Sequence, residues 1–168
     1  YAETLFDTSK SYEEIERDYF TYAFGDDYEK VLEYLKEISN LFDFSYMVSS
    51  TPLGHYHGER KNKDIAENLK RVAGVADAFT KTIDENAIKP YRVQQVSWQL
   101  LKDHAIFCKK YADACMERAL GNDKNALQKF NDLCDEMAIR EDKLQRYFDL
   151  GLFATMMGIE FKKSVSVY

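Results

Sequence analysis

Apolar and aromatic residues recur every three or four positions along most of the chain, which is the spacing of one face of an α-helix. Near the start this stripe consists of Tyr12, Ile15, Tyr19, Tyr22 and Ala23. Ser11 before it and Glu14 three residues later have the spacing of a capping box, and Gly25 after it suits a left-handed helix stop. A second stripe of the same kind follows at once. We therefore predict a helical hairpin over residues 11–44.

Two long helices are predicted over residues 62–120. The apolar residues of the first are Ile65, Leu69, Val72, Ala76, Phe79 and Ile83. They alternate steps of four and three, which is the seam of two helices that pack nearly antiparallel in a bundle. Pro90 fits the first turn of the second helix, where its missing N–H costs nothing. That helix runs to Gly121, a residue suited to ending it.

A closing helix is predicted over residues 122–160, capped by Asn122 or Asp123. With its predecessor it forms a long hairpin, in which each helix is roughly 45 Å long and residues whose numbers sum to about 243 lie level. The fold class predicted is therefore all-α, an antiparallel bundle of about five helices with a long C-terminal helical hairpin. We expect one domain over residues 1–168.

Composition and charge narrow the classes of function. The 168 residues are 45% hydrophobic and 31% charged, as in ordinary globular proteins. The net charge of −6, with Lys and Arg scattered along the chain, disfavours nucleic acid as a partner. No apolar run approaches the roughly 20 residues that span a bilayer. The chain starts at Tyr1 without the features of a signal peptide, so we expect a processed chain or a fragment of a larger protein.

The loop predicted over residues 45–61 contains the stretch "SSTPLGHYHGER". His55 and His57 would point the same way in an extended segment and could share a metal ion, although no adjacent Cys or Asp completes such a site. The imidazoles, Tyr56 and Arg60 are alternatively suited to contacting a sugar or a protein partner. The third interpretation is a plain connector between helices. The sequence leaves these alternatives open.

His104 lies on an apolar stripe, and Glu141 interrupts the stripe predicted to face it. A buried imidazole needs a hydrogen-bond partner, and a carboxylate on the next helix would serve. The pair is a candidate for acid–base chemistry, or else one satisfied polar contact in a core, and the second interpretation is favoured because nothing else catalytic converges there.

The three cysteines, Cys108, Cys115 and Cys134, lack CxxC spacing, so neither a disulfide framework nor a zinc site is indicated. Cys108 and Cys134 lie level in the predicted hairpin and could form a disulfide, but buried thiols acting as small apolar residues are favoured. We find no phosphate-binding loop, nucleophile elbow or serine–histidine–acid arrangement. The 12 Tyr and 11 Phe residues lie mostly at helical spacing and are interpreted as helix-packing residues. No catalytic residue and no cofactor are predicted.

The stretch "YFTYAFG" followed by "DDYEKVLEYL", and the later "SWQLLKDH" and "ALGNDKNALQKFNDL", carry a resemblance. They resemble the helical region that follows the catalytic barrel in a family of bacterial glycoside hydrolases related to α-glucuronidases and hexosaminidases. The resemblance implies a helical domain without the barrel, whose strand ends hold the catalytic carboxylates in such enzymes. It also implies that the 49–60 loop borders the barrel or its cleft.

Two functions from different classes are therefore expected. The first is a non-catalytic accessory domain of a glycoside hydrolase, with the parent barrel, a homo-oligomer or carbohydrate as its partner, in a secreted or cell-surface protein. The second is a free-standing helical interaction or ligand-sensing module, which would be cytoplasmic. A metal enzyme built around His55, His57 or His104 is a third and weaker alternative.

Overall fold

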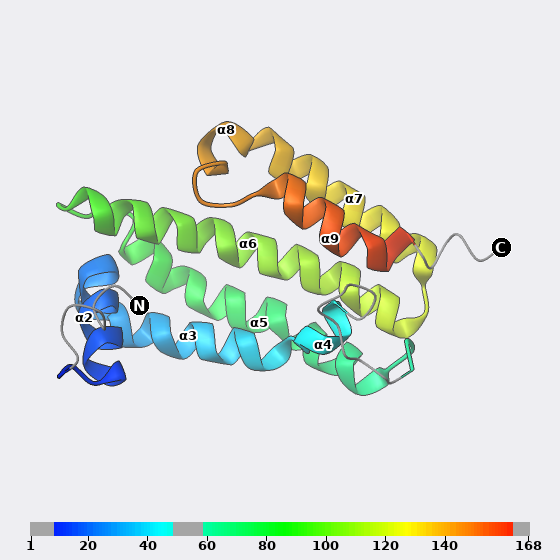
Figure 1. Cartoon of the computed structure of the whole chain (residues 1–168), viewed down its shortest axis with the longest axis horizontal. Helices are drawn as coiled ribbons and strands as arrows, with labels where there is room; N and C mark the ends of the chain where they lie inside the picture. Colours follow the sequence, from blue (N-terminus) through cyan, green and yellow to red (C-terminus); the bar gives the residue numbers. More distant parts are fainter. Residues whose placement is uncertain (1–8, 49–58, 163–168) are drawn as a thin grey trace.

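The computed structural model describes residues 9–48 and 59–162, and no strand occurs within these ranges. The helices form an elongated bundle (Figure 1). In chain order they are α2 (Tyr12–Phe24), the 3-10 turn η1 (Gly25–Asp27), α3 (Tyr28–Leu41), α4 (Phe44–Met47), α5 (Lys63–Glu85), α6 (Arg92–Leu120), α7 (Asp123–Ile139), α8 (Glu141–Leu144) and α9 (Leu150–Lys162). The predicted all-α class is confirmed. Within the described ranges, none of the helices combines the length and the apolar composition that crossing a bilayer requires.

The centre of the bundle is the antiparallel pair α5 and α6, which make the most extensive contacts between any two elements. Asn62 caps α5, because its side-chain oxygen accepts from the backbone N–H groups of Asp64 and Ile65. Every residue of the predicted seam, from Ile65 to Ile83, is buried. The two long helices predicted over residues 62–120 are therefore present. Pro90 does not lie in the first turn of the second helix, as predicted, because α6 begins at Arg92 with Tyr91 as its N-cap.

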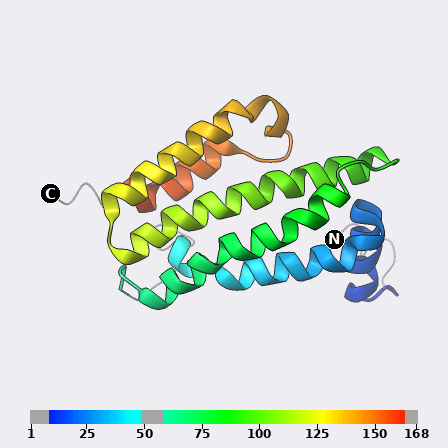
Figure 2. The same ribbon diagram turned by 180° about the vertical axis from the view of Figure 1, so that it is seen from behind.

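The first two helices depart from the predicted hairpin. The capping box at Ser11 and Glu14 is present, and Gly25 ends α2 with a φ of 75°. However, α2 lies across one end of the bundle while α3 runs along it (Figures 1 and 2). Ala23 is the only buried residue of α2. Of the stripe predicted to pack against its neighbours, Ile15 is half-buried, while Tyr12, Tyr19 and Tyr22 face solvent.

The end of α2 is fixed to the bundle by an aromatic contact. The Phe24 ring meets the Trp98 ring edge to face, with 5.5 Å between their centroids. The indole N–H of Trp98 also donates to the backbone carbonyl of Phe24 at 3.1 Å. Because Trp98 is 1% exposed, this single buried residue of α6 anchors a helix that is otherwise loosely packed.

The turn between α6 and α7 is the one predicted. Gly121 has a φ of 83°, in the left-handed region that favours glycine, and its N–H caps α6. Two ion pairs across the helices confirm the predicted register, since their residue numbers sum to 243 and 242. Arg140 contacts Asp103 at 2.7 Å, and Lys129 contacts Asp113 at 2.9 Å.

The predicted closing helix over residues 122–160 is wrong. The chain leaves α7 at Ile139, forms the single turn α8, and reverses so that α9 packs back along α7 (Figure 1). The register explains this: residue 151 would lie level with the start of α6, so about ten further residues would extend past the bundle. That segment, "LGLFATMMGIEF", is apolar, and folding back buries it against Phe130 and its neighbours.

The predicted 45–61 loop is only partly described. Its first residues belong to the short helix α4, in which the backbone N–H of Tyr46 donates to Asp43 at 2.9 Å. His55, Tyr56 and His57 lie outside the described residues. Arg60 lies within them and is placed below.

Candidate functional site

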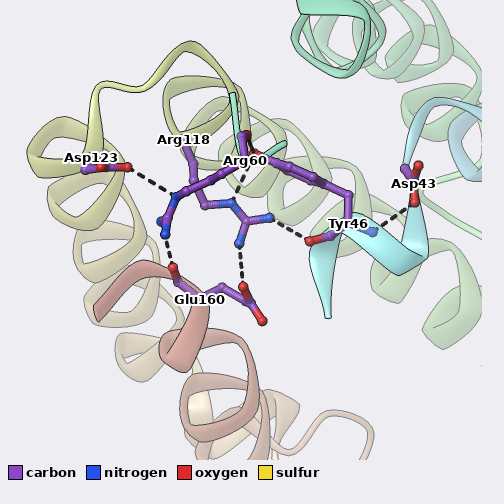
Figure 3. Close-up of polar contacts among 6 residues, drawn as sticks. All are labelled: Asp43, Tyr46, Arg60, Arg118, Asp123 and Glu160. Carbon is purple, nitrogen blue, oxygen red and sulfur yellow. Dashed lines mark hydrogen bonds and ion pairs between the residues drawn. The ribbon is translucent and has the colours of Figure 1, made fainter. Parts of the chain in front are cut away.

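The most distinctive group of polar side chains surrounds Arg118, near the C-terminal end of α6 (Figure 3). Arg118 is 1% exposed, Glu160 on α9 is 3% exposed, and Tyr46 on α4 is 2% exposed. Arg118 Nη2 donates to the backbone carbonyl of Tyr46 at 3.0 Å, and Nη1 lies 3.5 Å from Glu160 Oε2. The guanidinium carbon also lies 4.3 Å from the centre of the Tyr46 ring, in a cation–π contact. We call these three residues with Arg60 and Asp123 the Arg118 cluster.

Arg60, whose side chain is 39% exposed, contacts both α7 and α9 in this cluster. Its Nη2 donates to the backbone carbonyl of Glu160 at 3.0 Å, and its Nε lies 3.5 Å from Asp123 Oδ1. Its own carbonyl accepts from the hydroxyl of Tyr46 at 3.0 Å. The predicted role of Arg60, contacting a ligand or partner, finds no support in these contacts, because its guanidinium is turned toward α7 and α9.

The charges of the Arg118 cluster balance, with two guanidinium groups facing two carboxylates. Burial lowers the pKa of Arg118, but the neighbouring Cys115, Tyr46 and Tyr111 groups outweigh this effect, so its pKa lies above the ordinary value. Burial raises the pKa of the Cys115 thiol beside it to about 11. The cluster therefore holds a permanently charged arginine beside the neutral thiol of Cys115, and its contacts join α4, α6, α7 and α9 without supplying a nucleophile.

The sequence prediction missed Arg118 and Glu160, although a signal was present. Arg118 falls among the small buried residues of α6, next to Cys115 and Ala119, and Glu160 interrupts an apolar segment. A charge at a buried helical position requires an opposite charge nearby. The sequence does not show which charge is the partner, because Arg118 and Glu160 are 42 residues apart.

His104 is half-buried in the middle of α6, and its partners differ from the predicted one. Its Nδ1 lies 3.4 Å from the hydroxyl of Tyr34, and its Nε2 lies 3.3 Å from the sulfur of Cys108. Glu141 is exposed in the short helix α8. The predicted His104–Glu141 pair is therefore wrong, because α7 ends at Ile139 and carries Glu141 to the surface. The ion pair at this level joins the neighbouring residues Asp103 and Arg140 instead.

The contact between His104 and Cys108 brings a thiol next to an imidazole, as in enzymes with a cysteine nucleophile. Burial raises the pKa of Cys108 to about 12 and lowers the pKa of His104. Both shifts favour the neutral forms, so this pair lacks the thiolate–imidazolium state that such a nucleophile uses. Cys108, Cys115 and Cys134 are all free, and the first two are buried, as expected for thiols that act as small apolar residues.

A cavity of about 240 Å³ lies beside His104, where the chain reverses between α7 and α9. Its apolar walls are Leu100, Phe107, Met137, Leu144, Tyr147 and Phe148, and Asp103 and His104 supply the polar part of the lining. Within residues 9–48 and 59–162, no group of three or more His, Cys, Asp or Glu side chains is arranged to hold a metal ion. The metal hypothesis for His55 and His57 concerns residues outside the described ranges.

Comparisons with known proteins add no assignment. No protein-family model, no curated protein and no solved structure matches this chain.

Proposed function

We propose that this chain is a non-catalytic helical domain that packs against the catalytic barrel of a glycoside hydrolase in the same polypeptide. The observation that carries the proposal is the outward stripe of α2. Tyr12, Tyr19 and Tyr22 have exposed fractions of 72%, 65% and 70%. Tyrosines at helical spacing are the pattern of a packed face, and interfaces between proteins are enriched in tyrosine.

The exposed surface continues beyond α2 at the same end of the bundle. Ile88, in the turn before α6, is 88% exposed, and Tyr91, the N-cap residue of α6, is 69% exposed. Because α2 contacts α6, the three tyrosines and these two residues belong to one end of the molecule. We call this end, formed by Tyr12, Tyr19, Tyr22, Ile88 and Tyr91, the α2 surface.

The α2 surface has charges of both signs beside it. Glu13, Asp18 and Asp26 are exposed acidic residues of α2 and η1, and Asp18 is paired with Lys10 at 3.4 Å and lies 3.9 Å from Arg17. A partner that offers apolar and aromatic side chains with a mixed polar rim complements such a surface. The resemblance supports the barrel as occupant, because the similar region of such glycoside hydrolases follows the barrel directly.

A free-standing helical module that binds a protein or a small ligand is the second candidate function. The cavity beside His104 favours it, because a chain that only supports a barrel has no need of one. The reading frame upstream of Tyr1 separates the two candidates: a barrel encoded there supports the first, and a short complete frame supports the second.

The test uses the full-length protein that this frame encodes. Tyr12→Ala, Tyr19→Ala and Tyr22→Ala are combined in it, and separation of the domain from the barrel is measured by limited proteolysis and by thermal unfolding. We expect faster cleavage between the two parts and a lower melting temperature. The control is Ile139→Ala, which removes a side chain that is 85% exposed on α7. Equal behaviour of the triple variant, the control and the wild type would reject the proposal, as would hydrolysis of aryl glycosides by the isolated chain.

A further inference from the structure

The cavity beside His104 exists because the closing helix breaks. Leu100 and Phe107 of α6 form one wall, Met137 ends the α7 side, and Leu144 and Phe148 cover it from α8 and the reversal that follows. Met137 and Leu144 are each 6% exposed, so the walls belong to the packed core. The rings of Phe107 and Phe148 meet edge to face with centroids 5.4 Å apart, which gives the cavity an aromatic side.

The polar part of the lining is neutral in sum. Asp103 is paired with Arg140 at 2.7 Å, and burial keeps His104 in its uncharged form by lowering its pKa. A charged ligand would therefore have to leave water without a counter-charge, which is costly. A neutral ligand does not meet this cost.

Asp103 retains capacity to accept a hydrogen bond from such a ligand. A carboxylate offers about four lone-pair positions. Two donors occupy them in this structure, Arg140 Nη1 at 2.7 Å and the side-chain amide of Gln99 at 3.4 Å. The side chain of Asp103 is only 15% exposed, so a hydrogen bond to it would be shielded from water.

From these observations we infer that the cavity is a binding site for a small, neutral, planar aromatic molecule with one N–H or O–H group directed at Asp103. An apolar cavity of roughly 150 Å³ accepts benzene, so a volume of about 240 Å³ suits a ligand of about nine non-hydrogen atoms. Tyr147 lines the same cavity and is 57% exposed, which places it where a ligand would enter from solvent. The inference goes beyond the proposed function and holds for either candidate.

Indole and indene are the probes that test it, because they share size and shape and differ in the N–H group. Binding to the wild-type chain is followed by NMR titration. We expect a dissociation constant on the order of 1 mM for indole, which corresponds to a modest free energy per ligand atom. Indene should bind about tenfold more weakly, since it cannot donate to the carboxylate. Nuclear Overhauser contacts should join the indole protons to the methyl groups of Leu100, Met137 and Leu144.

A variant pair locates the site. Leu100→Phe fills the cavity and should abolish indole binding, while Val75→Phe adds an aromatic ring in the separate groove of about 420 Å³ between α3 and α5 and should leave binding unchanged. The absence of saturable indole binding at 10 times the expected dissociation constant would overturn the inference. So would contacts to methyl groups elsewhere, or equal binding of indole and indene. The wild-type measurements decide the matter even if Leu100→Phe does not fold.

Discussion

The two ends of this bundle reverse the usual distribution of side chains. At the α2 surface, tyrosines at helical spacing face solvent, and α2 contributes one buried residue. At the other end, the Arg118 cluster places a guanidinium and a carboxylate in the interior with exposed fractions of 1% and 3%. The ends also differ in what holds them. Hydrogen bonds at the capping box and the Trp98 contact fix α2, whereas a charged network spanning four helices fixes α9.

Whether a polar or an aromatic side chain is buried in this bundle depends on what lies opposite it. A buried charge is tolerated where a counter-charge and hydrogen bonds meet it, and an exposed aromatic stripe persists where no element of the described chain covers it. Substitutions in the Arg118 cluster are therefore expected to lower the free energy of unfolding strongly, and substitutions at the α2 surface are expected to change it little.

The largest effect is expected from breaking the buried ion pair on one side. Arg118→Met removes the guanidinium that faces the buried carboxylate of Glu160, and the free energy of unfolding should fall by about 3–5 kcal/mol. Urea denaturation monitored by circular dichroism measures it. The double variant Arg118→Met with Glu160→Leu removes both charges and should recover at least half of the loss. A double variant no more stable than the single one would mean that the loss comes from packing and not from the buried carboxylate of Glu160.

A smaller effect is expected from the pH dependence of stability that His104 contributes. His104 has no carboxylate partner among the described residues, and burial lowers its pKa below the ordinary value near 6.5. The unfolded chain then binds more protons than the folded one as the pH falls, so the His104 contribution is fully present above pH 6.5 and is lost below it. The wild type should lose stability between pH 6.5 and 5 relative to His104→Gln. Parallel curves for the two proteins would contradict the assignment.

The next effect concerns the local stabilisation of α2. Ser11→Ala removes the side chain that accepts from the backbone N–H of Glu14 at 3.2 Å, and capping substitutions cost about 1 kcal/mol. Because α2 buries little, the loss should appear as faster amide hydrogen exchange within Tyr12–Phe24 and not in α5. Ser39→Ala, at an exposed position inside α3, is the matched control. Equal protection of α2 in both variants would show that Trp98, not the cap, sets its stability.

The smallest effect is expected at the α2 surface of the isolated chain. Combining Tyr12→Ala, Tyr19→Ala and Tyr22→Ala should change the free energy of unfolding by less than about 0.5 kcal/mol per position, as is usual for exposed sites. Urea denaturation again provides the measurement. A loss of several kcal/mol would mean that the stripe packs within the chain after all, and the contrast between the two ends would disappear.

Part of the fold follows from short-range pattern. The capping box at Ser11, the seam of α5 and the turn at Gly121 are decided by residues within a few positions of each other, and the structure confirms all three. The register of α6 and α7 followed from that turn, because a short connection leaves two antiparallel helices little freedom to slide. Asp103 and Arg140 meet at the predicted level.

The candidate sites were less predictable, because they depend on where helices end. Because the sequence pattern does not show that α7 ends at Ile139, it predicts the wrong partner for His104 and gives no sign of the cavity. The stripe of α2 was identified, but periodicity shows which face of a helix is apolar and not whether another element covers it. The sequence places Arg60 in a polar loop, and only its contacts with Glu160 and Asp123 show that its guanidinium faces α7 and α9.

By itself the sequence determined that this chain is helical, where α6 ends, and which residues of α5 are buried. These features depend on backbone hydrogen bonding and on side chains one turn apart, both of which are encoded locally. Only the tertiary structure decided that the chain reverses after α7 and that Arg118 meets Glu160. It also decided that no element within residues 9–48 and 59–162 covers the α2 surface. Each of these outcomes depends on the length and position of helices that are distant in sequence, because apolar surface is buried only when those helices come into contact.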